Sequence, residues 1–345
     1  MITSSDTIDR VRDLIVRPNG DVWVLSASPP FVAIFDSVGA LRRAGGRVGR
    51  GPTDFLYPFL LVEQGQGGAE TVGVLDLGRH ELVQVDSSLA PSEARKLRVI
   101  GGVMRDDMPS LVASLPFAVA QSNETIIASS IPRGISTAVD LETQEIVQVR
   151  EDGGRTIAKF KEPSSGQYRW LRSYALWHAC GNGSLVGIDP THRILLRVDS
   201  SGDVDSTNIL LARDRKPLTE AAVKSNLRHH IELEQLYRGV HPSPTFLDSA
   251  ANRAFKGVVI SERDSLPIFS AIICSESGAP WLQVFDMGSS PVGAGRLWWR
   301  STSSGWERVI LPYGFRPFRA TGDKLFGVST ETNGVERIAS ASPRR

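Results

Sequence analysis

A short turn followed by a β-prone run recurs six times along the chain, and this repeat restricts the possible folds more than any other feature. Each copy joins Gly, Asn or other turn residues to β-branched and aromatic residues, which suit a pleated strand. The copies are residues 19–25, 69–75, 123–128, 182–188, 277–283 and 321–328. An internal repeat of short strands predicts a fold built from equivalent small sheets.

An aspartate marks the end of a second strand-like run after each of the first five copies. These residues are Asp36, Asp86, Asp140, Asp199 and Asp286, and each leads into a turn. An aspartate in this place accepts hydrogen bonds from its own turn. Because the five carboxylates recur once per unit and do not cluster, we interpret them as turn caps and not as metal ligands.

The spacing of the aspartates gives the size of the unit. Successive intervals are 50, 54, 59 and 87 residues, and the last contains an unusual segment, residues 212–244. Within it, Val223, Leu227 and Ile231 recur every four residues after Thr219, which predicts a capped helix. Without this segment the period is about 50–60 residues, within reach of a four-stranded propeller blade.

The sequence therefore predicts an all-β protein, a six-bladed β-propeller with a helical insertion between blades four and five. We expect a single domain over residues 1–345, with the insertion at 212–244. Residues 2–7 are predicted to supply the outer strand of the last blade, since the C-terminus ends after that blade's third strand.

Two segments resemble a known family. Residues 47–58, Arg-Val-Gly-Arg-Gly-Pro-Thr-Asp-Phe-Leu-Tyr-Pro, are similar to the junction between blades in NHL-like six-bladed propellers. Residues 311–328 resemble the end of a group of bacterial six-bladed propeller proteins, and the likeness covers roughly residues 8–340. It implies the fold, with Phe55 and Tyr57 wedged between blades. It implies no particular activity, although members of the group are usually exported.

Charge and cysteine content restrict the partners and the compartment. Lys and Arg total 39 against 38 Asp and Glu, a net charge of +1, which disfavours nucleic acid or an anionic membrane as the main partner. Cys180 and Cys274 are predicted to be buried free thiols. The chain as given shows neither a signal peptide nor an apolar run long enough to span a membrane. This favours the cytoplasm or the cytoplasmic face of a membrane, whereas the resemblance implies export.

Familiar catalytic motifs do not occur in the sequence. There is no P-loop, no His-Glu-x-x-His, no Cys-x-x-Cys and no Gly-x-Ser-x-Gly. The innermost strands are expected at 11–16, 58–62, 115–120, 170–177, 268–273 and 315–320, and they contain Asp13 but no other acid. A hard cation needs several oxygen ligands, so we predict no catalytic residue, no metal site and no cofactor.

Two groups of residues are candidates for binding. The innermost strands carry Arg12, Arg172, Tyr174, Arg316 and Arg319, which would hold a carboxylate, a phosphate or an acidic loop at the axis. Trp298 and Trp299 would stack on a sugar or anchor a partner protein. Each group also has a purely structural interpretation, with the arginines in solvent at different depths and the tryptophans in the core.

These observations favour a non-catalytic binding or scaffold propeller. We expect an accessory subunit of a larger bacterial protein complex, for example one that is extrinsic to a respiratory or photosynthetic membrane complex. A glycan- or peptide-binding propeller and an NHL-like metal-dependent hydrolase or lyase are the alternatives.

Overall fold

The protein was analysed as a computed structural model of the 345-residue chain. The structure describes residues 10–51, 54–63, 71–79, 81–96, 117–121, 125–129, 143–150, 153–161, 176–189, 193–199, 201–209, 211, 216–237, 241–256, 258, 260, 266, 268–286, 294–331 and 335–342.

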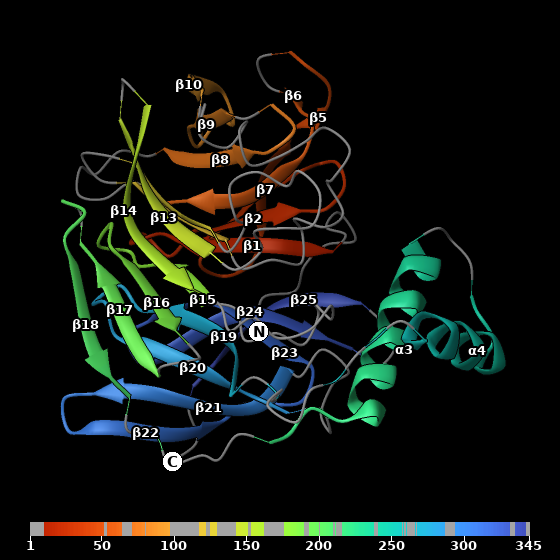
Figure 1. Ribbon diagram of the computed structural model, residues 1–345. Coiled ribbons are helices and arrows are strands. Elements are labelled where there is room, and N and C mark those ends of the chain that lie inside the picture. Colours follow the sequence, from red (N-terminus) through yellow and green to blue (C-terminus); the bar gives the residue numbers. More distant parts are fainter. Residues whose placement is uncertain are drawn as a thin grey trace.

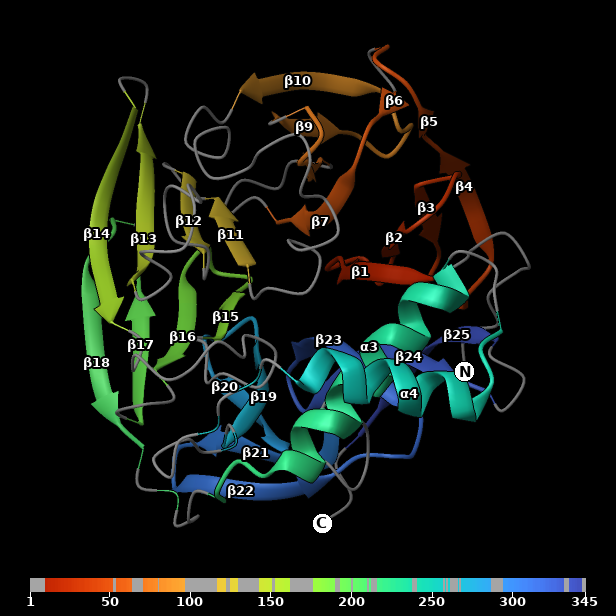
Figure 2. The same ribbon diagram turned by 45° about the vertical axis from the view of Figure 1, so that its right-hand side comes forward.

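Five antiparallel four-stranded sheets are arranged around a common axis (Figures 1 and 2). The first sheet contains β1 (Val11–Val16), β2 (Val22–Ser26), β3 (Val32–Phe35) and β4 (Leu41–Gly45). The second contains β7 (Pro58–Val62), β8 (Val72–Asp76), β9 (Glu81–Val85) and β10 (Pro91–Lys96). The third contains β11 (Phe117–Gln121), β12 (Thr125–Ser129), β13 (Thr143–Arg150) and β14 (Gly153–Lys161).

The remaining sheets continue the same order along the chain. The fourth contains β15 (Leu176–Ala179), β16 (Leu185–Asp189), β17 (Ile194–Val198) and β18 (Val204–Asn208). The fifth contains β19 (Phe269–Cys274), β20 (Pro280–Phe285), β21 (Ala294–Thr302) and β22 (Gly305–Ile310). A further sheet has three strands, β23 (Phe315–Thr321), β24 (Lys324–Thr330) and β25 (Glu336–Ala341). A parallel pair, β5 (Arg47–Val48) and β6 (Asp54–Phe55), lies between the first two sheets in the sequence.

The first strand of every sheet lies on the axis. β1 contacts β7, β7 contacts β11, β11 contacts β15, β15 contacts β19, β19 contacts β23, and β23 contacts β1. The innermost strands therefore form a closed ring, and the molecule is a β-propeller. Their described positions agree closely with those predicted from the sequence, and residues 170–175 of the expected fourth inner strand lie outside the described residues.

The structure shows five complete blades among the described residues, whereas the sequence predicted six. The sheet β23–β24–β25 has no fourth strand in the part of the chain that is described. The predicted outer strand, residues 2–7, lies outside the described residues. The six-bladed count and the narrower NHL-like assignment are therefore not shown by this structure.

The sequence repeat corresponds to the second strand of each sheet. Its six copies overlap β2, β8, β12, β16, β20 and β24. The aspartate caps are confirmed at three turns, where Asp36, Asp86 and Asp199 each accept backbone N–H groups two and four residues later. Asp286 instead follows β20, the second strand of its sheet, and Asp140 lies outside the described residues.

Apolar side chains fill the spaces between neighbouring blades. One cluster joins the first two sheets through residues such as Ile15 and Leu61, and Phe55 packs into it edge-on to Phe31, with ring centroids 6.2 Å apart. Phe55 is thus a wedge between blades, as predicted. Strands β2, β3, β8 and β9 of the first two sheets are buried at nearly every residue, so both of their faces are covered, which explains their nearly continuous apolar runs.

Two helices lie between β18 and β19 in the sequence. They are α3 (Glu220–Tyr237) and α4 (Pro244–Phe255), whereas the sequence predicted one helix ending before residue 244. Thr219 accepts the N–H of Ala222 at 3.2 Å, so it caps α3 as predicted. Val223 of α3 packs against Phe285 at the end of β20, which fixes the helix on the fifth blade (Figure 2).

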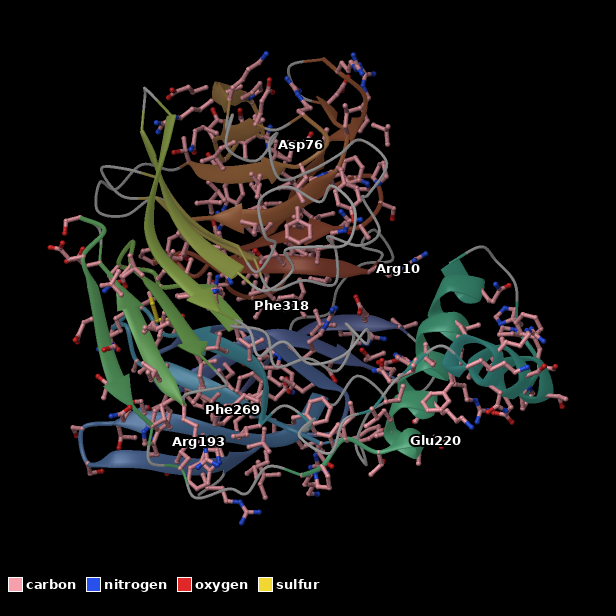
Figure 3. All side chains as sticks on the ribbon, viewed as in Figure 1. Arg10, Asp76, Arg193, Glu220, Phe269 and Phe318 are labelled. Atoms are coloured by element: carbon pink, nitrogen blue, oxygen red, sulfur yellow. A yellow bond between two sulfur atoms is a disulfide. The ribbon has the colours of Figure 1, made fainter. Side chains whose placement is uncertain are left out.

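The two cysteines form a disulfide, so the prediction of free thiols is wrong. Cys180 follows β15 and Cys274 ends β19, and their Cα atoms are 5.0 Å apart across 94 residues of sequence (Figure 3). The sequence offered no local motif because the two residues become neighbours only when the fourth and fifth blades pack side by side. The bond ties these two blades together near the axis.

Candidate functional site

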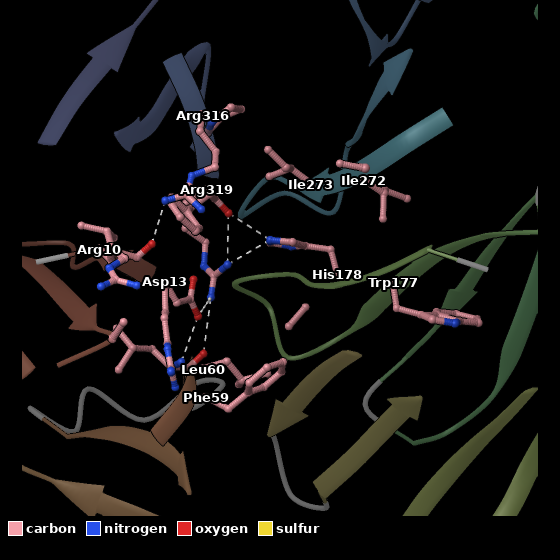
Figure 4. Close-up of a pocket in the computed structure, with 18 of the residues that line it drawn as sticks. Arg10, Asp13, Phe59, Leu60, Trp177, His178, Ile272, Ile273, Arg316 and Arg319 are labelled. Atoms are coloured by element: carbon pink, nitrogen blue, oxygen red, sulfur yellow. Dashed lines mark hydrogen bonds and ion pairs between the residues drawn. The ribbon is translucent and has the colours of Figure 1, made fainter. Parts of the chain in front are cut away.

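A cavity of about 570 Å³ lies on the propeller axis, among the innermost strands. Its walls come from the β1, β7, β15, β19 and β23 regions (Figure 4). Propellers commonly bind ligands at this position because side chains from several blades converge there. The volume falls within the range of small-molecule sites.

The floor of the cavity is built around Arg319. Its Nη2 donates to Asp13 Oδ2 at 3.2 Å and to the Leu61 carbonyl oxygen at 3.4 Å, and its Nη1 donates to the Phe318 carbonyl oxygen at 3.1 Å. Nη1 also lies 2.9 Å from His178 Nε2. One side chain of β23 thus donates to groups on β1 and β7, so Arg319 links three inner strands at the axis.

Asp13 is the buried acid of this network. Its Oδ1 accepts the Leu14 N–H and its Oδ2 accepts the Leu61 N–H, both at 2.9 Å. Burial raises the pKa of Asp13, and the adjacent Arg319 and the two backbone N–H groups only partly oppose this rise. Asp13 therefore connects the first two blades while keeping an unusually high proton affinity for an aspartate.

His178 is held on both ring nitrogens. Nδ1 accepts the Cys274 N–H at 3.2 Å, so Nε2 carries the proton and donates to the Phe318 carbonyl oxygen at 3.0 Å. Burial, followed by the positive charge of Arg319, lowers the pKa of His178 to about 3. The imidazole is therefore neutral at physiological pH and acts as a hydrogen-bonded spacer between β15, β19 and β23.

Two arginines above this floor rest on aromatic rings. Arg12 lies 4.5 Å from the centroid of Tyr57 and donates to the Pro58 carbonyl oxygen at 2.6 Å. Arg316 lies 4.8 Å from the centroid of Phe318 and donates to the Val11 carbonyl oxygen at 2.8 Å. Cation–π contacts and backbone acceptors hold both guanidinium groups in place.

A glutamate balances part of this positive charge. Glu336 Oε1 pairs with Arg316 Nη2 at 3.1 Å, and Glu336 Oε2 accepts the Val11 N–H at 2.7 Å. The cavity lining contains four arginines, with Arg10 as the fourth, and two carboxylates, Asp13 and Glu336. The arginines outnumber the carboxylates, so the lining carries an excess of positive charge. The neutral His178 does not add to this excess.

The structure places the predicted site residues in different environments. Arg12, Arg316 and Arg319 line the cavity, and their role in binding stays a prediction. Arg172 and Tyr174 lie outside the described residues. Trp298 is 1% exposed and belongs to the core, and Trp299 is partly buried against the cluster between the fourth and fifth blades. Trp298 is therefore not a platform for a sugar.

Several site residues were missed by sequence reasoning. Tyr57 was expected between blades, but it lies at the cavity, stacked on Phe59 with ring centroids 6.4 Å apart. The pairing of Asp13 with Arg319 joins residues 306 positions apart, and that of Glu336 with Arg316 joins residues 20 positions apart on strands of one sheet. The sequence did carry one signal, since Asp13 is the single acid on the expected inner strands.

The described residues show no group of three or more His, Cys, Asp or Glu side chains that would hold a metal ion. None of the helices described is both long and apolar enough to cross a membrane.

Comparisons with known proteins support the propeller fold only. No family model matches the chain, and no curated protein matches its sequence. Among solved structures, a protein of Bacteroides fragilis aligns with a TM-score of 0.56 at 9% identity, over 95% of this chain and 82% of the other.

Two further structures align more loosely. Virginiamycin B lyase from Staphylococcus aureus gives a TM-score of 0.43 at 13% identity, over 99% of this chain and 86% of the lyase. The calcium-binding protein regucalcin from Agrobacterium tumefaciens gives a TM-score of 0.43 at 10% identity, over 95% of this chain and 84% of regucalcin. The likeness to the Bacteroides fragilis protein, at 9% identity, shows a shared fold and transfers no activity.

Proposed function

We propose that this protein is a non-catalytic binding propeller whose axial cavity holds a small organic anion. The observation that carries the proposal is the pair of arginines, Arg12 and Arg316, each fixed over an aromatic ring at the cavity. Each guanidinium has five N–H donors, which is more than the described contacts use. Donors that are already oriented bind an anion at a smaller entropic cost.

The hydrogen bonding of the floor supports binding over catalysis. A general base needs a nitrogen or oxygen that can reach a substrate proton. Both ring nitrogens of His178 are engaged by backbone groups, and both oxygens of Asp13 accept bonds from buried partners. These two residues therefore support the cavity from below.

Titration calorimetry with benzoate and citrate, at constant ionic strength, tests the proposal. We expect at least one of the two anions to bind. The double variant Arg12→Gln/Arg316→Gln should bind roughly tenfold more weakly or worse, because hydrogen bonds to charged groups are lost. Arg308→Gln is the matched control, since Arg308 is an exposed arginine on β22. Equal binding by the double variant and the control would reject the cavity as the site.

A scaffold role in a larger complex is the second candidate, and two exposed apolar side chains favour it. Ile310, at the end of β22, is 51% exposed, and Tyr313, in the following turn, is 79% exposed. Exposed apolar side chains near each other often mark a protein contact. In native extract, we expect Ile310→Ser/Tyr313→Ser to shift the protein from a large complex to the size of the single chain. Elution of the unaltered protein as a single chain would reject this role.

We also propose that β23–β24–β25 is a sixth blade completed by residues 2–7. In each of the other sheets the outermost strand leads to the innermost strand of the next sheet. A strand preceding β1 would therefore belong to the sheet before it in the ring, beside β25. This would cover an edge that is otherwise open to pairing. Deleting residues 1–8 should lower the melting temperature by several degrees, and an unchanged melting temperature would reject the proposal.

A further inference from the structure

The axial cavity has two chemically different halves. Its cationic side comes from the neighbouring β1 and β23 regions, with Arg10, Arg12 and Arg316. Its apolar side comes from the neighbouring strands β15 and β19, which contribute Trp177, Ile272 and other uncharged residues. Figure 4 shows Arg10 and Arg316 on one side of the view, and Trp177 and Ile272 on the other.

The third wall, from β7, is aromatic and apolar. Tyr57 and Phe59 lie side by side with their rings 20° from parallel, and Leu60 follows them along the cavity lining. Phe59 and Leu60 are partly exposed, so their surfaces are available to a ligand. This wall connects the cationic half to the apolar half around the ring of inner strands.

We propose that the ligand is an amphipathic carboxylate, with one anionic head at Arg12 and Arg316 and an apolar body against β7, β15 and β19. This inference rests on the proposed function and specifies its ligand class. A cavity of about 570 Å³ is far larger than a single small inorganic anion requires. Only the β1–β23 side offers charged partners, so a second negative group on the ligand would face an uncharged wall.

The contacts of Glu336 favour a carboxylate as the head group. Its own carboxylate bridges the Arg316 guanidinium and the Val11 N–H. The structure therefore shows that this side of the cavity accommodates carboxylate geometry, and an arginine fork matches the two oxygens of such a group. The ligand's head would lie beside Glu336 and use the donors that Arg12 and Arg316 have left over.

A panel of small probes at constant ionic strength tests the inference by calorimetry. Benzoate and octanoate should bind roughly tenfold more tightly than acetate and citrate, because only they bury apolar surface against the uncharged walls. Benzamide, which has the same shape as benzoate but no charge, should bind at least tenfold more weakly than benzoate. Equal or tighter binding of citrate would overturn the amphipathic ligand while leaving the anion site in place.

The remaining outcomes separate the two proposals. Failure of every anion to bind would overturn the proposed function together with this inference. Equal binding of benzamide and benzoate would overturn the anionic head in both, and would indicate a purely apolar site.

Variants of the β7 wall test where the apolar body lies. Phe59→Ser should weaken the binding of benzoate and octanoate severalfold. The binding of acetate should stay unchanged, since acetate has no apolar body that contacts this wall. Phe246→Ser, at an exposed phenylalanine on α4, is the matched control. Leu60→Ser provides a second change in the same wall if Phe59→Ser unfolds. Unaltered benzoate and octanoate binding in a folded wall variant would overturn the placement.

Discussion

Arg319 shows at the scale of one residue how the propeller axis is closed. Its side chain is 14% exposed and that of its partner Asp13 is 9% exposed, so both charges are largely removed from water. Such charges are tolerated only when they are paired and hydrogen-bonded. The bonds from Arg319 to Asp13, Leu61 and Phe318 meet this requirement and bring three blades to one point.

Replacing Arg319 by leucine should destabilise the protein by about 3–5 kcal/mol, because Asp13 would remain buried without its cation. Denaturant unfolding measures the free energy. Asp13→Asn/Arg319→Leu should recover part of the loss, since no buried charge then remains unpaired. If Arg319→Leu unfolded at the same denaturant concentration as the unaltered protein, the network would have no structural role.

The neutral state of His178 predicts a dependence of stability on acid. The folded pKa is lowered from 6.5 to about 3, so the unfolded chain binds a proton that the folded chain rejects between these values. The contribution of neutral His178 to the free energy of unfolding is fully present above about pH 6.5. It is lost as the pH falls toward the folded pKa, by up to about 1.4 kcal/mol per pH unit. His178→Gln should flatten this slope in pH-dependent denaturant unfolding. Parallel curves for the two proteins between pH 6.5 and pH 3 would contradict the assignment.

At the scale of the element, close packing between strands explains where glycines stand. Gly187 on β16 lies opposite Trp177 on β15. A Cβ atom built on Gly187 would come within 2.1 Å of the Trp177 ring. The indole therefore occupies the space that a side chain at residue 187 would need, and the β15–β16 pair depends on this glycine.

Gly187→Ala should destabilise the protein by about 1–3 kcal/mol or more, since the Trp177 ring must move to admit the methyl group. Gly322→Ala is the control, because a Cβ atom there would meet nothing within 4 Å. Its positive φ of 55° carries only a modest strain of about 1 kcal/mol. Thermal unfolding compares the stability of the two variants. Equal destabilisation by both would show that contact with Trp177 is not what excludes a side chain at residue 187.

At the scale of the whole molecule, the Cys180–Cys274 disulfide links two neighbouring blades. Both residues are almost fully buried, at 3% and 2% exposure, and Cys274 also donates its N–H to His178. The bond therefore joins the ring of inner strands to the floor of the cavity. Disulfides persist mainly in oxidising compartments.

Removing the disulfide should lower the free energy of unfolding. We expect Cys180→Ala/Cys274→Ala to lose about 2–5 kcal/mol, because the unfolded chain regains the freedom of a long closed loop. Thiol titration of the unaltered protein in denaturant, without reductant, should detect no free thiol. Two free thiols per chain in protein isolated from its native compartment would contradict the bond.

The sequence by itself determined the propeller and the order of its strands. The β-prone runs, the turn residues and the capping aspartates act within a few residues of one another, so the second strands and the caps at Asp36, Asp86 and Asp199 were predictable. The arginines of the axis were also predictable once the innermost strands had been located.

Only the tertiary structure decided which of these residues meet. Cys180 and Cys274, Asp13 and Arg319, and Val11 and Glu336 are far apart in the chain and have no local pattern. The packing of the blades around the axis brings the members of each pair together. No spacing rule applied to a single sequence predicts such pairs. The physical reason is that turns and strands depend on local interactions, whereas a binding cavity depends on contacts between separate blades.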